Sequence, residues 1–181
     1  MLRRKGDIME CSKLEGNGLL IRKILEEDIE LIREWRNQTD VRKYFINNNY
    51  INKDQQKKWF EEYLKKKSDI MFIIEETIEF KSAIGTVALY NINLEKNSAE
   101  FGRLMIGYLP SVGKGFGKRA AILACKYAFE ILGLSEIYLN VLIHNVKAIN
   151  LYSNLGFVVR AAHPNEFNMV LSKEDYMNYL P

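Results

Sequence analysis

Three glycines separated by single residues, Gly113, Gly115 and Gly117, precede a long segment whose apolar residues recur at helical spacing. Glycine lacks a Cβ atom, so a backbone with this spacing can curl tightly enough to aim several N–H groups at one point. The first turn of the following helix would add unpaired N–H donors and the positive end of the helix dipole. The stretch therefore predicts an anion-binding loop. The alternative is a merely tight turn between a strand and a helix.

Two cations, Lys118 and Arg119, stand where that helix would begin. Each would cost up to about 1 kcal/mol there, because the dipole disfavours positive charge, and a bound phosphate would reverse the sign. The two familiar nucleotide-binding loops do not fit the sequence. A Walker loop needs one more residue between its glycines and a Ser or Thr in place of Arg119, and a dinucleotide fingerprint needs a third glycine at position 118.

A second candidate segment reads HNVKAINLYSNLGFVV. Asn145 has the position of a helix N-cap, and Gly156 has the position that follows a helix C-terminus. Between them, the apolar residues recur at helical spacing and include Tyr152. A phenol can donate a proton, but Tyr152 taken alone is better explained as a core aromatic of this apolar stripe.

The rest of the chain predicts the elements that must position these residues. Strands are expected at 19–24, 70–76, 82–92, 98–107, 136–142, 157–159 and 167–172. Helices are expected at 26–38, 53–67, from the glycine loop to about residue 133, and at 146–155, with a short turn at 41–45 and a polar tail at the end. Asn52 and Gln55 form a capping pair for the helix 53–67, whose apolar stripe comprises Trp59, Phe60, Tyr63 and Leu64.

The order of these elements indicates the fold class. Three consecutive strands between residues 70 and 107 predict an antiparallel meander, whereas the alternation of strand and helix after them predicts some parallel pairing with a crossover. We therefore expect a mixed α/β fold with a mostly antiparallel central sheet flanked by helices. A single domain would span residues 1–181, with residues 1–18 as a lead that is either flexible or an extra strand.

Composition excludes several classes of function. The 181 residues carry 26 Lys and Arg against 23 Asp and Glu, a net charge of +3 that is too small to indicate nucleic acid, and the lysines at 53–67 fit a solvated helix face. Cys11 and Cys125 have neither the spacing of a metal site nor that of a disulfide framework. No apolar run reaches the roughly 18 residues of a membrane span, and no signal peptide is recognisable. We expect a cytoplasmic protein without metal, membrane or nucleic-acid partners.

The order of the two candidate segments along the chain indicates one family of proteins. A glycine-rich helix start, a strand, and then N-x-x-A-x-x-L-Y-x-x-x-G-F resemble the signature of the GNAT N-acetyltransferase superfamily. The resemblance spans about residues 19–170. The segment LIREWRNQTDVRKYF resembles the branch that includes ribosomal-protein N-terminal, spermidine and amino-sugar acetyltransferases. It implies a GNAT-like sheet in which a parallel pair of strands splays around acetyl-CoA.

The resemblance also implies roles for individual residues. Backbone N–H groups of the loop would hold the cofactor pyrophosphate, the strand before the loop would pair with the pantetheine arm and polarise the acetyl carbonyl near Ile106, and Asn145 would contact the cofactor. Tyr152 would protonate the departing thiolate, since a phenol is protonated at neutral pH. Val112 departs from the Gln or Arg that the family usually has there, which removes one polar contact. The implied cofactor-binding residues are Leu104, Met105, Ile106, Gly113, Lys114, Gly115, Phe116, Gly117, Lys118 and Asn145.

The amine acceptor needs a base, because an amine is protonated at neutral pH. Glu100 is the candidate, since alternation along the strand sets Glu100, Gly102 and Leu104 on one face, while Arg103 on the other face is given a structural role. The alternatives for the base are a water chain, or a Glu100 that is only a surface or salt-bridged residue. In relatives the acceptor pocket is lined by the region of Trp35, which we assign to the core. Candidates for contacting a polar or anionic acceptor, such as a sugar nucleotide, are Arg36, Asn37 and Arg42.

The sequence thus predicts an acetyl-CoA-dependent N-acetyltransferase that transfers acetyl directly to a primary amine. A small-molecule amine such as an amino sugar is favoured over a peptide N-terminus. A non-catalytic acyl-CoA-binding module is the alternative from another class. A homodimer is one option for the assembly.

Overall fold

The computed structural model describes residues 12–45 and 47–179. The strands are β1 (Lys13–Gly16), β2 (Leu19–Lys23), β3 (Ile70–Glu76), β4 (Ser82–Asn93), β5 (Ser98–Ile106), β6 (Glu136–Leu142), β7 (Val158–Ala162) and β8 (Glu166–Ser172). The helices are η2 (Glu26–Asp28), α1 (Ile29–Asn37), α2 (Thr39–Arg42), α3 (Lys53–Lys65), η3 (Leu109–Ser111), α4 (Phe116–Lys126), η4 (Tyr127–Ile131), α5 (Val146–Ser153) and α6 (Lys173–Tyr179). All predicted strands and helices of the described region are present; β3 and β6 have the predicted ends, and the others have shifted ends.

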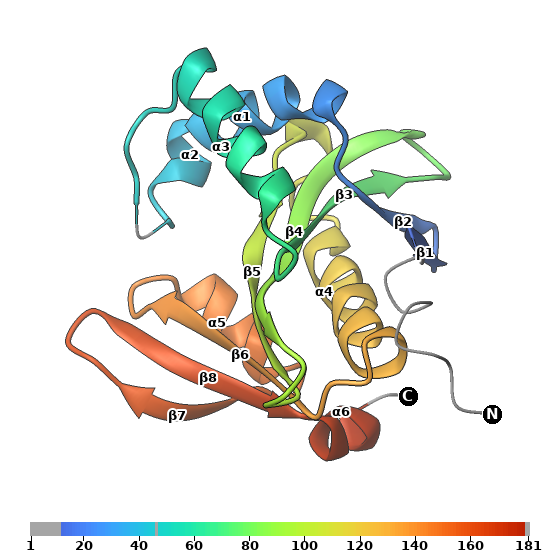
Figure 1. Ribbon diagram of the computed structural model, residues 1–181, viewed down its shortest axis with the longest axis vertical. Coiled ribbons are helices and arrows are strands. Elements are labelled where there is room, and N and C mark those ends of the chain that lie inside the picture. Colours follow the sequence, from blue (N-terminus) through green and yellow to red (C-terminus); the bar gives the residue numbers. More distant parts are fainter. Residues whose placement is uncertain (1–11, 46, 180–181) are drawn as a thin grey trace.

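The strands form one eight-stranded sheet in the order β1-β2-β3-β4-β5-β6-β8-β7 (Figure 1). Every neighbouring pair is antiparallel except β5 and β6, which are parallel and connected by the crossover helix α4. The expectation of a mixed, mostly antiparallel sheet flanked by helices is confirmed. The lead before residue 19 contributes the extra edge strand β1 in its described part, and Cys11 lies outside the described residues.

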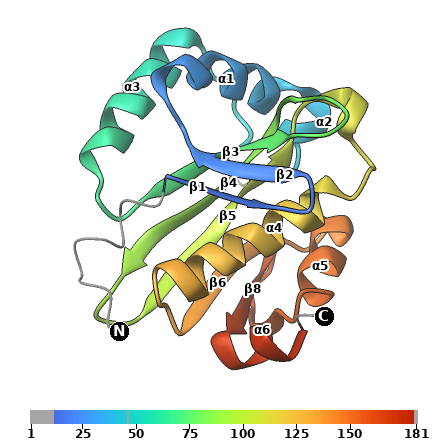
Figure 2. The same cartoon turned by 90° about the vertical axis from the view of Figure 1, so that its right-hand side faces the viewer.

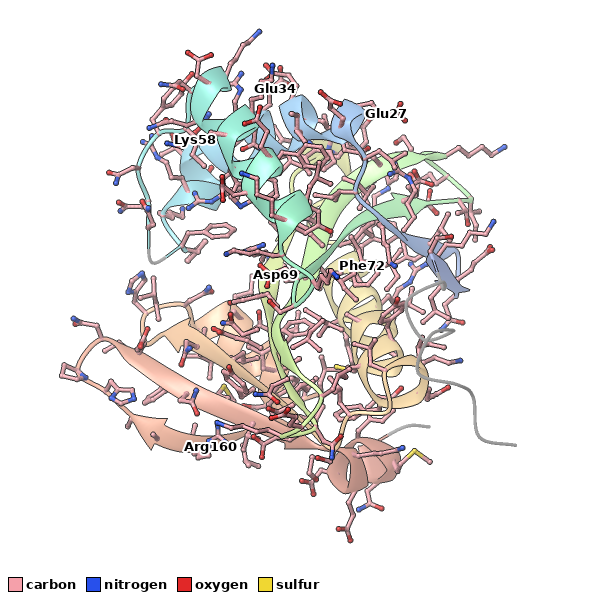
Figure 3. The ribbon with its side chains drawn as sticks, in the orientation of Figure 1. Glu27, Glu34, Lys58, Asp69, Phe72 and Arg160 are labelled. Carbon is pink, nitrogen blue, oxygen red and sulfur yellow. The ribbon has the colours of Figure 1, made fainter. Side chains whose placement is uncertain are left out.

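Helices cover both faces of the sheet (Figure 2), and each face has its own cluster of buried apolar side chains. On one face, α4 packs on β2–β6, and Phe72 of β3 meets Tyr127 at a ring-centroid distance of 4.9 Å (Figure 3). On the other face, α1 and α3 pack on β3, β4 and β5 through residues that include the buried Trp35, as expected. Residues 70–74 of β3 are buried throughout because helices cover both faces of the strand.

The parallel pair stays together only at its beginning. Register partners run from Ser98↔Glu136 to Glu100↔Tyr138, after which β5 continues to Ile106 without a partner in β6. Strands that diverge leave main-chain N–H and C=O groups unpaired along the facing edges. This opening supplies a strand edge to which an extended ligand can hydrogen-bond.

Two sequence expectations are wrong. The polar tail after β8 is in fact the helix α6, whose buried Tyr176 packs against Phe129 of η4 at 4.9 Å between ring centroids. Leu64 does not belong to the apolar stripe of α3, because it is 66% exposed near the end of that helix, which stops at Lys65. Packing against η4 stabilises α6 although its sequence is polar, whereas Leu64 fits the helical spacing but has no core to pack against.

The capping pair of α3 is confirmed. The Asn52 side chain accepts a hydrogen bond from the Gln55 backbone N–H at 2.9 Å, and the Gln55 side chain accepts one from the Asn52 N–H at 2.9 Å. Replacing Asn52 by alanine leaves a first-turn N–H group without its acceptor. We expect Asn52→Ala to lower the free energy of unfolding by about 1 kcal/mol in urea denaturation. Asn48→Ala, at an exposed position outside any helix, is the control, and an equal loss in both variants would contradict the capping role.

Candidate active site

The glycine loop has the geometry of an anion cradle. Gly113 and Gly115 adopt the left-handed region with φ of +84° and +80°, and Gly115 is the N-cap of α4. A Cβ atom at either position would meet no heavy atom within 4 Å, so the space in front of the loop is open. Within the described residues, five consecutive or near-consecutive backbone N–H groups donate no hydrogen bond: those of Gly113, Gly115, Phe116, Gly117 and Lys118.

The cations around the cradle have different surroundings. Lys114 forms an ion pair with Glu79 at 2.5 Å and lies 4.6 Å from the ring centroid of Phe80. Arg119 stacks on Phe116 at 4.8 Å and donates to the Asn17 carbonyl. Lys118 is exposed and has no ion-pair partner within residues 12–45 and 47–179. Of the two residues that the dipole disfavours, Arg119 is therefore held within the protein, whereas Lys118 is available to an anion.

In β5, the strand before the loop, the side chains that follow Arg103 point to the opposite faces of the sheet from those that simple alternation predicts. Arg103 has a φ of +50°, and the register with β4 shifts there, so two residues of β5 face one of β4 in a β-bulge. The Thr86 hydroxyl donates to the Arg103 carbonyl at 2.8 Å. The bulge breaks the simple alternation on which the sequence prediction relied.

The prediction that Glu100, Gly102 and Leu104 share a face is therefore wrong. Glu100 and Gly102 lie against Tyr90, on the side of α1 and α3, whereas Leu104 and Ile106 pack on the layer of α4. Met105 points to the α1 and α3 side. Arg103 is not on the face opposite Glu100, since its guanidinium lies 4.7 Å from the ring centroid of Tyr90.

Glu100 sits where β5 and β6 begin to separate. Its carboxylate accepts hydrogen bonds from the Tyr90 hydroxyl at 3.0 Å, from Asn91 Nδ2 at 2.9 Å and from Asn140 Nδ2 at 3.1 Å. Burial and then the Glu100 charge raise the pKa of Tyr90, so this phenol remains a donor at neutral pH. The sequence analysis did not single out these three donors, because two lie on β4 and one on β6, and they share no common motif.

Tyr152 lies on the other face of β5. It is 8% exposed, and its ring packs edge-on against Phe101 of β5 at a centroid distance of 5.8 Å. Burial, with a smaller contribution from Cys125, raises its pKa well above the ordinary value of a phenol. Its hydroxyl makes no hydrogen bond to any described residue. The Tyr152 hydroxyl is consequently protonated at neutral pH, and its proton is available for a hydrogen bond to a ligand.

The helix that carries Tyr152 is built as its sequence indicates. Asn145 is the N-cap of α5 and accepts from the Ala148 N–H at 3.2 Å, and Gly156 after the helix has a φ of +93°. The Asn145 side chain thus has a structural role, and its contact with a cofactor remains a prediction.

A cavity of about 510 Å³ opens on the Glu100 face of the sheet, between α1, α3 and the segment that joins α2 to α3. Its lining comprises Ile32, Arg36, Phe45, Asn47, Asn49, Tyr50, Ile51, Gln55, Gln56, Trp59, Met71, Thr86, Arg103 and Met105. Of the three residues expected to contact an acceptor, only Arg36 lines it. The Asn37 amide binds the backbone of Ile51 through hydrogen bonds of 2.7 and 2.8 Å, and Arg42 lies outside the lining.

A second hollow, of about 680 Å³, lies near the β7–β8 turn. It contains His144 and His163 but none of the residues predicted to act in catalysis. Residues 12–45 and 47–179 contain no group of three or more His, Cys, Asp or Glu side chains that could hold a metal ion. Within the same residues, no helix is long and apolar enough to cross a membrane.

Comparison with known proteins identifies the family. Residues 18–158 match the family model described as an acetyltransferase (GNAT) domain. The chain belongs to the GNAT acetyltransferases. The spermidine N(1)-acetyltransferase of Vibrio cholerae is 31% identical over 150 residues, which cover 82% of this chain and 84% of that protein. Acetyltransferase PseH of Campylobacter jejuni is 27% identical over 149 residues, covering 82% and 88%.

A solved structure agrees with this assignment. The crystal structure of the V. cholerae spermidine N-acetyltransferase in complex with CoA and spermine superposes with a TM-score of 0.81 at 27% identity, covering 90% of this chain and all of that one. The protein is therefore a GNAT N-acetyltransferase that uses acetyl-CoA, as the sequence predicts. A pyrophosphate fits the glycine loop, which offers five unpaired N–H groups within the described residues and open space before Gly113 and Gly115. Lys118, which has no ion-pair partner among those residues, adds a positive charge.

The cradle can be tested by adding a single Cβ atom. Alanine in the left-handed conformation costs roughly 1–2 kcal/mol, and relieving that strain at position 115 would turn the cradle N–H groups away from the ligand. We expect Gly115→Ala to weaken CoA binding about tenfold or more, because hydrogen bonds to charged groups contribute about 1.5–3 kcal/mol each. Binding would be measured by calorimetric titration with CoA.

A matched control exists in this GNAT acetyltransferase. Gly133 also has a positive φ, +71°, and open space at its Cβ position, but it follows η4 at the other end of the helix. Gly133→Ala should lose similar stability and keep its affinity for CoA. Equal weakening of CoA binding in both variants would exclude the cradle.

Proposed function

We propose that this enzyme transfers acetyl from acetyl-CoA directly to the primary amine of a small molecule, with an amino sugar as the favoured acceptor. One observation carries the proposal: β5 lies between a protonated tyrosine, Tyr152, on one face and the Glu100 carboxylate with the 510 Å³ cavity on the other. An acid and a base on opposite sides of one strand can serve the departing sulfur and the entering amine separately.

In the proposed reaction acetyl-CoA supplies an acetyl thioester. The N–H groups from Gly113 to Lys118 bind its pyrophosphate, and the β5 edge at 104–106 orients its pantetheine arm through main-chain hydrogen bonds. Glu100 takes a proton from the ammonium form of the acceptor, directly or through water. As the N–C bond forms and the C–S bond breaks, the Tyr152 hydroxyl gives its proton to the sulfur. The nitrogen loses its second proton as the amide forms, and this proton returns through water to the Tyr152 phenolate. A backbone N–H near Ile106 stabilises the charge that develops on the carbonyl oxygen.

The proposal is tested by release of free CoA thiol from acetyl-CoA. Amino sugars, polyamines and peptides with a free N-terminus would be supplied as acceptors, and the product would be identified by mass. Transfer to a small amine supports the proposal, whereas transfer only to peptides would favour an N-terminal acetyltransferase. CoA binding without thiol release above background for any acceptor would favour a non-catalytic binding module.

The homodimer remains a prediction, and light scattering of the purified protein would measure its oligomeric state.

Tyr152→Phe removes the proposed acid and keeps the ring in the core. We expect the rate of acetyl transfer to fall by about 10²- to 10⁴-fold, the range for a positioned proton donor, while CoA affinity changes little. Tyr176→Phe is the matched control, since Tyr176 is also a buried phenol with a raised pKa, and its hydroxyl has no hydrogen-bond partner in the described structure. Unchanged turnover in Tyr152→Phe would remove this residue from the role of acid.

Glu100→Gln removes the proposed base and keeps a side chain of the same size. We expect kcat/KM to fall by about 100-fold near neutral pH. The loss should shrink as the pH rises toward the pKa of the amine, because more acceptor is then already deprotonated. Glu95→Gln, in the turn between β4 and β5, is the exposed control. A loss that is the same at every pH would assign Glu100 to structure instead.

A further inference from the structure

We infer that the acceptor amine carries an acidic group, a phosphate or a carboxylate, which Arg36 and Arg103 bind in the 510 Å³ cavity. The inference rests on the proposed function, because it defines the substrate class of the same site. It also separates this enzyme from its spermidine-acetylating relatives, whose named substrate is a polycation.

The two arginines of the cavity have no carboxylate partner among the described residues, whereas three other arginines form ion pairs. Arg22, Arg33 and Arg160 each meet a carboxylate oxygen at 2.7 Å. Arg36 and Arg103 form no ion pair within the described residues, and the described lining of the cavity includes neither Asp nor Glu. A cavity with two unpaired guanidinium groups and no carboxylate attracts anions and repels polycations.

Arg36 lacks an acceptor for part of its guanidinium. One terminal nitrogen donates to the Asn47 carbonyl, and the group stacks on Phe45 at 3.7 Å from the ring centroid. The other terminal nitrogen, Nη1, is buried without a hydrogen-bond partner, and burial lowers the pKa of this arginine. A buried charged donor without an acceptor is unfavourable, so an acidic oxygen at this point completes its hydrogen bonding.

Arg103 is held in place by its backbone and by two aromatic rings. The bulge fixes its unusual backbone conformation, and its guanidinium lies 4.7 Å from the Tyr90 centroid and 5.8 Å from that of Trp59. The Glu100 carboxylate next to Tyr90 is already occupied by other donors, namely Tyr90, Asn91 and Asn140. Stacking leaves the edge of the guanidinium, with its N–H donors, free for a planar or tetrahedral anion.

The surroundings of the cavity favour the same class of acceptor. Helix α3, which contributes Gln55, Gln56 and Trp59 to the lining, belongs to a stretch with six lysines and three acidic residues between positions 53 and 67. Lys58 projects from this helix (Figure 3). This positive field would raise the local concentration of an anionic acceptor. The cavity volume is within the range of small-molecule sites, and its amide side chains suit the hydroxyl groups of a sugar.

The decisive experiment compares acceptors that share an amine and differ in charge. Acetylation of glucosamine, glucosamine 1-phosphate, glucosamine 6-phosphate, 2-amino-2-deoxyglucuronic acid and spermidine would be followed by thiol release. We expect at least one acidic member to exceed glucosamine by about tenfold or more in kcat/KM, with spermidine no better than glucosamine. The phosphate and uronate arms distinguish the two sources of acid. Faster transfer to glucosamine or spermidine than to every acidic amine would overturn the inference.

Variants assign the effect to the two arginines. Arg36→Gln and Arg103→Gln should each raise KM for the preferred acidic amine by about 10- to 100-fold, and the loss should be smaller for glucosamine, which has no acidic group for the arginine to bind. Arg103→Lys, which keeps the charge, should recover part of the loss. Arg160→Gln on β7, far from Lys58 and α3 in Figure 3, is the control. An acid preference that survives both Gln variants would contradict the assignment.

A binding measurement separates failure of this inference from failure of the proposed function. Glucosamine 6-phosphate would be titrated calorimetrically into the CoA-bound wild type and the same variants. Arginine-dependent binding without any turnover would support the acidic site and reject the enzyme activity on small amines. Turnover with no acid preference would retain the function and reject the site. Absence of both turnover and arginine-dependent binding of any acidic member would overturn the inference as well.

Discussion

The left-handed backbone at Arg103 is the constraint on which both halves of the site depend. A non-glycine residue in this region costs roughly 1–2 kcal/mol, and here the Thr86 hydroxyl, bonded to the Arg103 carbonyl at 2.8 Å, helps to hold it. The bulge changes which face each later residue of β5 presents. Without it, Leu104 would face α1 and α3, and Met105 would face α4. With it, β5 gives apolar side chains to the α4 layer and places Arg103 at the 510 Å³ cavity.

The separation of β5 from β6 is the second constraint, and it depends on polar side chains at the point of divergence. Glu100 and Tyr138 are the last register partners, and the Asn140 amide of β6 reaches the Glu100 carboxylate across the beginning of the gap. Beyond that point the main-chain groups along the facing edge of β5 have no strand in β6 to pair with. An unpaired strand edge can pair with a strand of another molecule, which leads to aggregation. A cosubstrate that hydrogen-bonds along this edge would cover it, and because it binds only the folded protein, it would also stabilise the fold.

Local signals made much of this structure predictable. The capping residues Asn52 and Asn145 and the left-handed Gly156 act within one turn of their own helices, and their sequence positions therefore sufficed. The bulge at Arg103 has no such signal, because its hydroxyl partner, Thr86, is on another strand. For the same reason the sequence misassigned the face of Leu104, missed the three donors to the Glu100 carboxylate, and did not reveal α6, whose stability comes from packing against η4. The glycine loop could be found by its spacing, whereas the 510 Å³ cavity is lined by two helices, three strands and the segment that joins α2 to α3.

This difference has a consequence for the evolution of specificity in such enzymes. In the proposed site, the cofactor half would use main-chain N–H groups and a strand edge, which many side-chain replacements leave unchanged. The acceptor half would use side chains such as Arg36 and Arg103, each of which one substitution can remove. At 31% identity, a relative can therefore share the acetyl donor and differ in the charge of its acceptor. Because the discrimination between substrates is a difference of binding free energies, two unpaired arginines in the cavity would favour an acidic amine over a polycation.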